Sequence, residues 1–115
     1  MTKDKKATEE KIRQLQLAEQ GMQVLLSQKQ SLQIQLMEID SALKELETAG
    51  EAYKIVGNIM VASEKSKLQG ELKEKKETVE LRIKTLETQE SKTREKAEVI
   101  QKEVLEEMKN DDKNG

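Results

Sequence analysis

An apolar segment in the middle of the chain constrains the fold more than any other feature. Residues 52–62 have the sequence A-Y-K-I-V-G-N-I-M-V-A, and eight of these eleven residues are apolar in a chain that is 34% apolar overall. The Gly57-Asn58 pair at the centre is typical of the two-residue turn of a β-hairpin. Because two strands rarely form a stable structure alone in water, the segment predicts further packing partners.

Both faces of the predicted hairpin are apolar or nearly so. With a turn at Gly57-Asn58, Val56 pairs with Ile59 and each strand extends away from the turn. One face then carries Tyr53, Ile55, Met60 and Ala62, and the other carries Lys54, Val56, Ile59 and Val61. A hairpin with one solvated face would alternate apolar and polar residues. We therefore expect hairpins of several chains to join in a shared sheet or barrel, which would also cover their open edges. The alternative is a hairpin that folds back on its own helices.

Two long charged segments flank the hairpin, and both have the heptad spacing of a coiled coil. The first predicted helix covers residues 8–48, and its heptad seam has one charged interruption, Lys29. The seam consists of Leu15, Ala18, Met22, Leu25, Lys29, Leu32, Leu36, Ile39, Leu43 and Leu46. The second covers residues 67–109, and its seam consists of Leu72, Lys76, Val79, Ile83, Leu86, Glu90, Thr93, Ala97, Ile100 and Val104. We expect residues 1–7 and 110–115 to be flexible tails.

The similar length of the two helices and the compact linker between them favour an antiparallel pair. A long parallel dimer is the competing arrangement, but the hairpin would interrupt its heptads. The predicted fold is therefore mostly α. It is a single domain over residues 1–115, an antiparallel two-helix coiled coil whose β-hairpin linker, residues 52–62, joins an intersubunit β-barrel.

Composition argues against catalysis and against metal or nucleic-acid binding. The chain has no histidine and no cysteine, and therefore lacks the imidazole and thiolate groups of common nucleophile pairs and zinc sites. It has no glycine-rich phosphate loop, and its 21 basic and 23 acidic residues are interleaved along the chain. No apolar run is long enough to span a membrane, and no signal peptide is visible. We expect a cytoplasmic protein that is not an enzyme and has no cofactor, metal, nucleic-acid or membrane partner.

The hairpin and its two flanking helices together resemble a known family. The segment from Tyr53 to Val61 has the pattern Y-K-x-V-G-N-x-x-V, and together with two flanking helices of equal length it is similar to the β-class subunit of prefoldin. The segment from Glu71 to Glu90, E-L-K-E-K-K-E-T-V-E-L-R-I-K-T-L-E-T-Q-E, resembles the start of that family's second helix. The resemblance covers roughly residues 10–108, and the hairpin is its most specific part.

The resemblance implies a particular assembly and activity. It implies a hexamer of two α-class and four β-class subunits whose hairpins build a double β-barrel body, and the single hairpin here indicates the β class. The implied assembly residues are Tyr53, Ile55, Val56, Gly57, Asn58, Ile59, Met60 and Val61. The implied activity is that of an ATP-independent holdase, which captures non-native polypeptides at the tips of the coiled coils and passes them to a group II chaperonin. The alternative is a purely structural coiled-coil spacer or oligomerisation module.

Apolar residues near the two ends of the chain are the candidate client-binding residues. They are Ile12, Leu15, Leu17, Val104, Leu105 and Met108. Leucine and methionine suit unrelated partners because their flexible side chains repack readily. Leu15 and Val104 also fall on the two seams, so packing between the helices is the alternative role for them. Three further apolar residues outside the first seam, Val24, Ile34 and Met37, are candidates for an inner wall or a contact with a neighbouring subunit.

Overall fold

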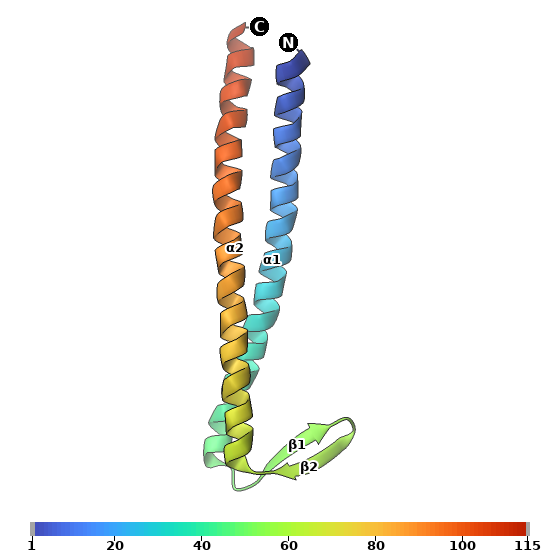
Figure 1. Cartoon of the computed structure of the whole chain (residues 1–115), viewed down its shortest axis with the longest axis vertical. Helices are drawn as coiled ribbons and strands as arrows, with labels where there is room; N and C mark the ends of the chain where they lie inside the picture. The colour runs from blue at the N-terminus through green and yellow to red at the C-terminus, as the bar shows by residue number, and fades with distance from the viewer. Residues whose placement is uncertain (1, 115) are drawn as a thin grey trace. The chain divides into compact units, whose positions relative to one another are not determined.

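A computed structural model describes the backbone of residues 2–114 and the side chains of residues 5–110. The chain forms helix α1 (Thr2–Thr48), strands β1 (Ala52–Val56) and β2 (Ile59–Ser63), and helix α2 (Lys65–Asn114) (Figure 1). The predicted order of helix, hairpin and helix is therefore confirmed. The two strands form an antiparallel two-stranded sheet.

Three of the four helix ends differ from the sequence-based expectation. Helix α1 ends at Thr48 as expected but begins at Thr2, so it includes residues 2–7. Helix α2 begins at Lys65, where the amide of Leu68 donates to the Glu64 carbonyl at 3.0 Å, and it extends to Asn114. No proline or glycine interrupts these terminal stretches, so the backbone has no local reason to leave the helix. Residues 1 and 115 lie outside the described part of the chain.

The chain divides into two compact units, which we name by their contents. The hairpin unit contains residues 29–85, and therefore the hairpin with the adjoining parts of both helices. The terminal unit combines the part of α1 up to Gln28 with the part of α2 from Leu86 onward. Within each unit the α1 and α2 segments lie side by side and run in opposite directions (Figure 1). This is the antiparallel pairing that the sequence predicts.

The hairpin unit has a closely packed apolar seam. Ile39 and Val79 are 6% and 5% exposed, and Leu32, Leu46 and Ile83 are also buried. All five residues belong to the predicted heptad seams, so the predicted pattern identifies this core. At the flank of the seam the Lys76 ammonium lies 2.8 Å from the Asp40 carboxylate, and this hydrogen bond raises the pKa of Lys76.

The terminal unit has a thinner seam made from the same heptad positions. Leu86 and Val104 are buried together with the carboxylate residue Glu90, but none of the described α1 residues in this unit is fully buried. The remaining seam residues are half-buried, and three of them have small side chains: Ala18, Thr93 and Ala97. Small side chains bury little apolar area and make few contacts across the seam. The terminal unit therefore has less apolar packing than the hairpin unit.

Candidate functional site

The β-hairpin has the geometry that its sequence predicts. Val56 pairs with Ile59, Ile55 with Met60, Lys54 with Val61 and Tyr53 with Ala62, and one further pair joins Ala52 to Ser63. Gly57 has a φ of 63°, in the left-handed region that a two-residue hairpin turn requires and that glycine adopts without steric cost. The turn therefore fixes the register, and the register fixes which side chains share a face.

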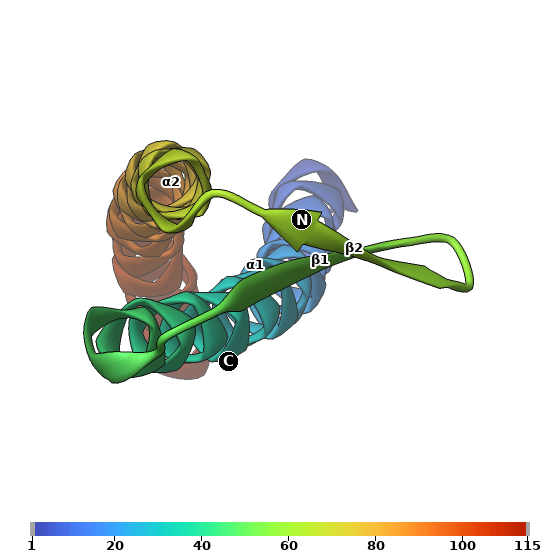
Figure 2. The same ribbon diagram turned by 90° about the horizontal axis from the view of Figure 1, so that it is seen from below.

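The apolar side chains of the hairpin are exposed in this chain. Every residue from Tyr53 to Ala62 is exposed, and Ile55 reaches 70%. Ala52, at the base of β1, is buried. Figure 2 shows the ribbon projecting from the adjoining helix ends and not lying along them. The alternative arrangement, a hairpin folded back on its own helices, is therefore not the one adopted.

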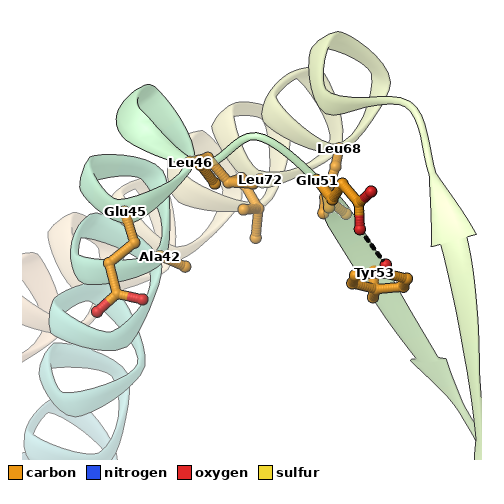
Figure 3. Close-up of a pocket in the computed structure, with 9 residues that line it drawn as sticks. Ala42, Glu45, Leu46, Glu51, Tyr53, Leu68 and Leu72 are labelled. Carbon is orange, nitrogen blue, oxygen red and sulfur yellow. Dashed lines mark hydrogen bonds between the residues drawn. The ribbon is translucent and has the colours of Figure 1, made fainter.

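Three polar contacts lie around the base of the hairpin. The Lys54 ammonium donates to a Glu71 carboxylate oxygen of α2 at 3.2 Å, and the Lys65 ammonium donates to the Glu47 carbonyl of α1 at 3.1 Å. The Tyr53 hydroxyl donates to the Glu51 carboxylate, and this hydrogen bond raises the pKa of Tyr53 (Figure 3). One of these contacts, between Lys54 and Glu71, joins the hairpin to α2, while the apolar faces beyond the base remain uncovered.

Two neighbouring cavities lie at the base, and both are lined by Tyr53, Leu68 and Leu72. The first, of about 280 Å³, lies between the end of α1 and the start of α2 and is also lined by Ala42 and Leu46 (Figure 3). The second, of about 480 Å³, continues along the hairpin to Ile55. Their linings mix apolar and charged side chains, and the acidic residues are Glu45 and Glu51 in the first cavity and Glu71 in the second. Among the described residues no group of three or more such side chains is placed to hold a metal ion.

The six candidate client-binding residues all lie in the terminal unit but differ in accessibility. Leu17, Leu105 and Met108 are about half exposed and Ile12 is somewhat less exposed. Leu15 is half-buried, and Val104 is buried at 7% exposure. Leu15 and Val104 therefore pack in the seam between the two helices. This packing is the alternative role that the sequence left open for them. The other four present apolar surface outside the seam.

An ionic cluster in the terminal unit is absent from the sequence-based prediction. Lys11 forms ion pairs with Glu107 and with Glu103, the second at 3.4 Å, and the Thr8 hydroxyl donates to Glu107. The hydrogen bond from Lys11, followed by that from Thr8, lowers the pKa of the Glu107 carboxyl, and the bond to Glu107 raises the pKa of Lys11. Lys11 and Glu107 continue the two seams by one step of four residues from Leu15 and of three residues from Val104, so the heptad spacing marks both positions. Their pairing with each other follows only once the antiparallel register is known.

Comparison with known proteins decides the family. Residues 9–111 match the family described as prefoldin subunit. The chain belongs to the prefoldin subunit family. Two similar relatives are the prefoldin subunit beta of Archaeoglobus fulgidus, 43% identical over 95 residues, and that of Thermococcus onnurineus, 40% identical over 94 residues. Each alignment covers 79% of this chain. The alignment covers 82% of the Archaeoglobus fulgidus relative and 81% of the Thermococcus onnurineus relative.

A solved structure agrees with this assignment. The crystal structure of the prefoldin beta subunit from Thermococcus strain KS-1 superposes with a TM-score of 0.81 at 37% sequence identity. The match covers 85% of this chain and 89% of that one. It confirms the predicted combination of two long helices with a small antiparallel hairpin and the predicted resemblance to the β class.

Family membership sets the general function. Members of the family are chaperones that form hetero-oligomers of prefoldin subunits, so this chain is a prefoldin chaperone subunit. Within the part of the chain that the structure describes, neither helix combines the length and apolar character needed to cross a membrane.

Proposed function

We propose that this chain is the β-class subunit of a cytoplasmic, ATP-independent holdase. In this proposal two α-class and four β-class subunits assemble through their hairpins into a shared β-barrel body. The assembled chaperone captures non-native polypeptides and passes them to a group II chaperonin. The observation that carries the proposal is the exposed hairpin: one of its faces is apolar, the other is apolar except for Lys54, and neither is covered by the chain's own helices.

The hairpin supports the assembly step of the proposal. A monomer would leave Ile55, Met60 and Val61 in water, together with the unpaired backbone groups of both strand edges. Joining hairpins from several subunits into a closed barrel pairs the edges and buries the faces at the same time. The apolar surface of the hairpin is thereby assigned to subunit contact, and the terminal unit is assigned to the client.

The terminal unit supports the capture step. Its exposed aliphatic residues Ile12, Leu17, Leu105 and Met108 are interspersed with charged residues, so the apolar surface is accessible without being one large continuous patch. Leucine and methionine can repack against different partners at little cost. Leu15 and Val104 contribute by holding the helices of this unit together.

The test is aggregation of an unfolded enzyme in the presence of the chain and an α-class partner without ATP. We expect assembly into a hexamer and suppression of aggregation at near-stoichiometric amounts. A variant that lacks residues 1–17 and 104–115 separates a holdase from a structural spacer. It keeps the hairpin and should still assemble, but it should lose client capture. A well-formed hexamer of the full chain that does not suppress aggregation would refute the proposal.

A further inference from the structure

An ion pair joins the hairpin to helix α2 at the base of β1. Lys54 is the one charged residue in the two strands, and its ammonium lies 3.2 Å from a Glu71 carboxylate oxygen of α2. The two side chains are 50% and 43% exposed. The pair therefore lies at the surface, where it keeps much of its hydration in the isolated chain. We name it the Lys54–Glu71 bridge.

The Lys54–Glu71 bridge connects the two walls of a cavity. The cavity has a volume of about 480 Å³ and lies between β1 and the first turns of α2. Ile55 is an apolar residue of the strand wall, and Leu68 and Leu72 are the apolar residues of the helix wall. Lys54 and Glu71 come from opposite walls, so their ion pair spans the gap. A segment that enters the cavity beside β1 therefore has to contact or displace these two charges.

The open edge of β1 lies beside the same cavity. Residues of an antiparallel pair alternate between those that are hydrogen-bonded to the partner strand and those whose backbone groups point away from it. Val56 and Ile59 flank the two-residue turn and belong to the first kind, so Tyr53 and Ile55 belong to the second. Both Tyr53 and Ile55 line the cavity. Figure 1 shows β1 on the side of the hairpin that faces along the helices and β2 on the far side.

We propose that the Lys54–Glu71 bridge prevents copies of this chain from pairing at the β1 edge and leaves that edge to a subunit of different sequence. The inference rests on the proposed hairpin assembly and adds to it the residues that select the partner. Strand β2, Ile59–Ser63, has no charged residue, so its edge remains open to a copy of the chain. Self-association is thereby confined to the β2 edge, and the β1 edge receives the α-class subunit.

Two contacts between copies are disfavoured at the β1 edge. A β2 strand of a second copy would cover the bridge with the uncharged side chains of I-M-V-A-S. Burial removes both charges from water, and this costs more than their attraction returns unless further hydrogen bonds are made. A β1 strand of a second copy, centred antiparallel on the same groove, would bring the two Lys54 ammonium groups close together. Like charges placed opposite each other destabilise a strand pair.

The exposed position of the bridge gives it a role in selection and little role in folding. An ion pair at the surface changes the stability of an isolated chain only slightly. The unfavourable effect arises when an uncharged strand covers the pair. A strand that places a hydrogen-bonding side chain against Lys54 and Glu71 avoids it, because charge-assisted hydrogen bonds replace the lost hydration. The α-class partner therefore carries a polar or charged side chain at this place.

Self-association of the full chain tests the restriction. Lys54→Leu combined with Glu71→Leu removes both charges. Lys73→Leu combined with Glu74→Leu is the matched control, because these residues are exposed on α2 outside the cavity. Sedimentation velocity should show that the Lys54/Glu71 variant forms larger oligomers than the parent chain, at about a tenfold lower concentration. The control should match the parent, and circular dichroism verifies that both variants keep their helices. Equal self-association of the Lys54/Glu71 variant and the parent overturns the inference. A control that self-associates as strongly as this variant also overturns it, since the added leucines alone would then be the cause.

Exchange of the two charges tests the bridge itself. Lys54→Glu combined with Glu71→Lys restores an ion pair at the same place and adds no apolar side chain. This variant should self-associate like the parent. Self-association as strong as that of the leucine variant would overturn the inference, because the charges would then be irrelevant.

Native mass spectrometry of the parent chain with an α-class partner distinguishes the inference from the proposed function. A parent chain that forms no hexamer refutes the proposed assembly. A hexamer of the parent, together with unchanged self-association of the leucine variant, refutes the inference alone.

Discussion

The hairpin unit and the terminal unit contain the same two helices but distribute apolar residues differently. In the hairpin unit, large aliphatic residues such as Leu32, Ile39 and Val79 fill the seam and are buried. In the terminal unit, the seam contains small residues such as Ala18 and Ala97, while Leu17 and Leu105 point outside it. Both units also expose single aliphatic residues on their helices, such as Ile34 and Met37 in the first and Leu17 and Leu105 in the second. The difference therefore lies in the seam, which has large buried side chains in the first unit and more small, half-buried ones in the second.

This difference shows how one coiled coil can serve two tasks. A well-packed base can hold the hairpin in a defined orientation, as precise assembly requires. A thinly packed terminal region opens more easily and adapts to partners of different shape, because local stability follows the density of buried apolar contacts. We therefore expect substitutions in the two units to affect different properties of the protein.

The largest expected effect comes from charges on the hairpin. Ile55→Glu combined with Met60→Glu places two carboxylates on one apolar face of every hairpin. An unpaired charge in an apolar interface costs several kcal/mol, so association should weaken more than about a thousandfold. Native mass spectrometry should show dissociated chains, while circular dichroism retains much of the helix signal. A hexamer that persists unchanged would exclude the shared barrel.

The matched change in the terminal unit is Leu105→Glu combined with Met108→Glu. Both side chains are about half exposed, so the fold tolerates the charges. This variant should assemble normally and lose most of its ability to suppress aggregation. If it loses assembly as well, or keeps full chaperone activity, then the two units do not divide the tasks in the way proposed.

An intermediate effect is expected from truncations in the two seams. Ile39→Ala removes a side chain that is 6% exposed and should lower the free energy of unfolding by about 2–5 kcal/mol. Met22→Ala removes a half-buried seam residue of the terminal unit and should cost about 1 kcal/mol, because less buried area is lost. Urea unfolding at one fixed protein concentration measures both values, since assembly makes stability depend on concentration. Similar costs would show that the two seams are equally packed.

The sequence predicts the local geometry of this molecule well, because that geometry follows from short-range rules. The Gly57-Asn58 turn determines the pairing of Val56 with Ile59, and the structure confirms it. The heptad period identifies the seams, and every predicted seam residue is buried or half-buried. Turn type and hydrophobic period each depend on residues close together in the sequence, which a single chain reveals.

The sequence predicts less well where the outcome depends on distant residues. It predicts a late beginning for α1 and an early end for α2, because the charged stretches at the chain ends have no strong hydrophobic period of their own. It does not predict the cluster of Lys11 with Glu103 and Glu107, since that contact joins residues more than 90 positions apart and requires the antiparallel register.

The smallest expected effect concerns the pH dependence of the ion pairs. The pKa of Glu107 is lowered in the folded chain, so its contribution to stability is present above the ordinary glutamate pKa of about 4.3 and is lost as the pH falls through the lowered value. The pKa values of Lys11 and Lys76 are raised, so their contributions are lost only as the pH rises through values above about 10.4. Acid should therefore loosen the terminal unit around Thr8, Lys11 and Glu107, and alkali should weaken the ion pairs of Lys11 and Lys76. Amide hydrogen exchange of residues 8–11, compared between pH 7 and about pH 2.5 after correction for intrinsic rates, measures the acid effect, because the loss begins only below the ordinary glutamate pKa of about 4.3. Glu107→Gln should remove most of the pH dependence at these amides, and an unchanged dependence in that variant would show that other carboxylates are responsible.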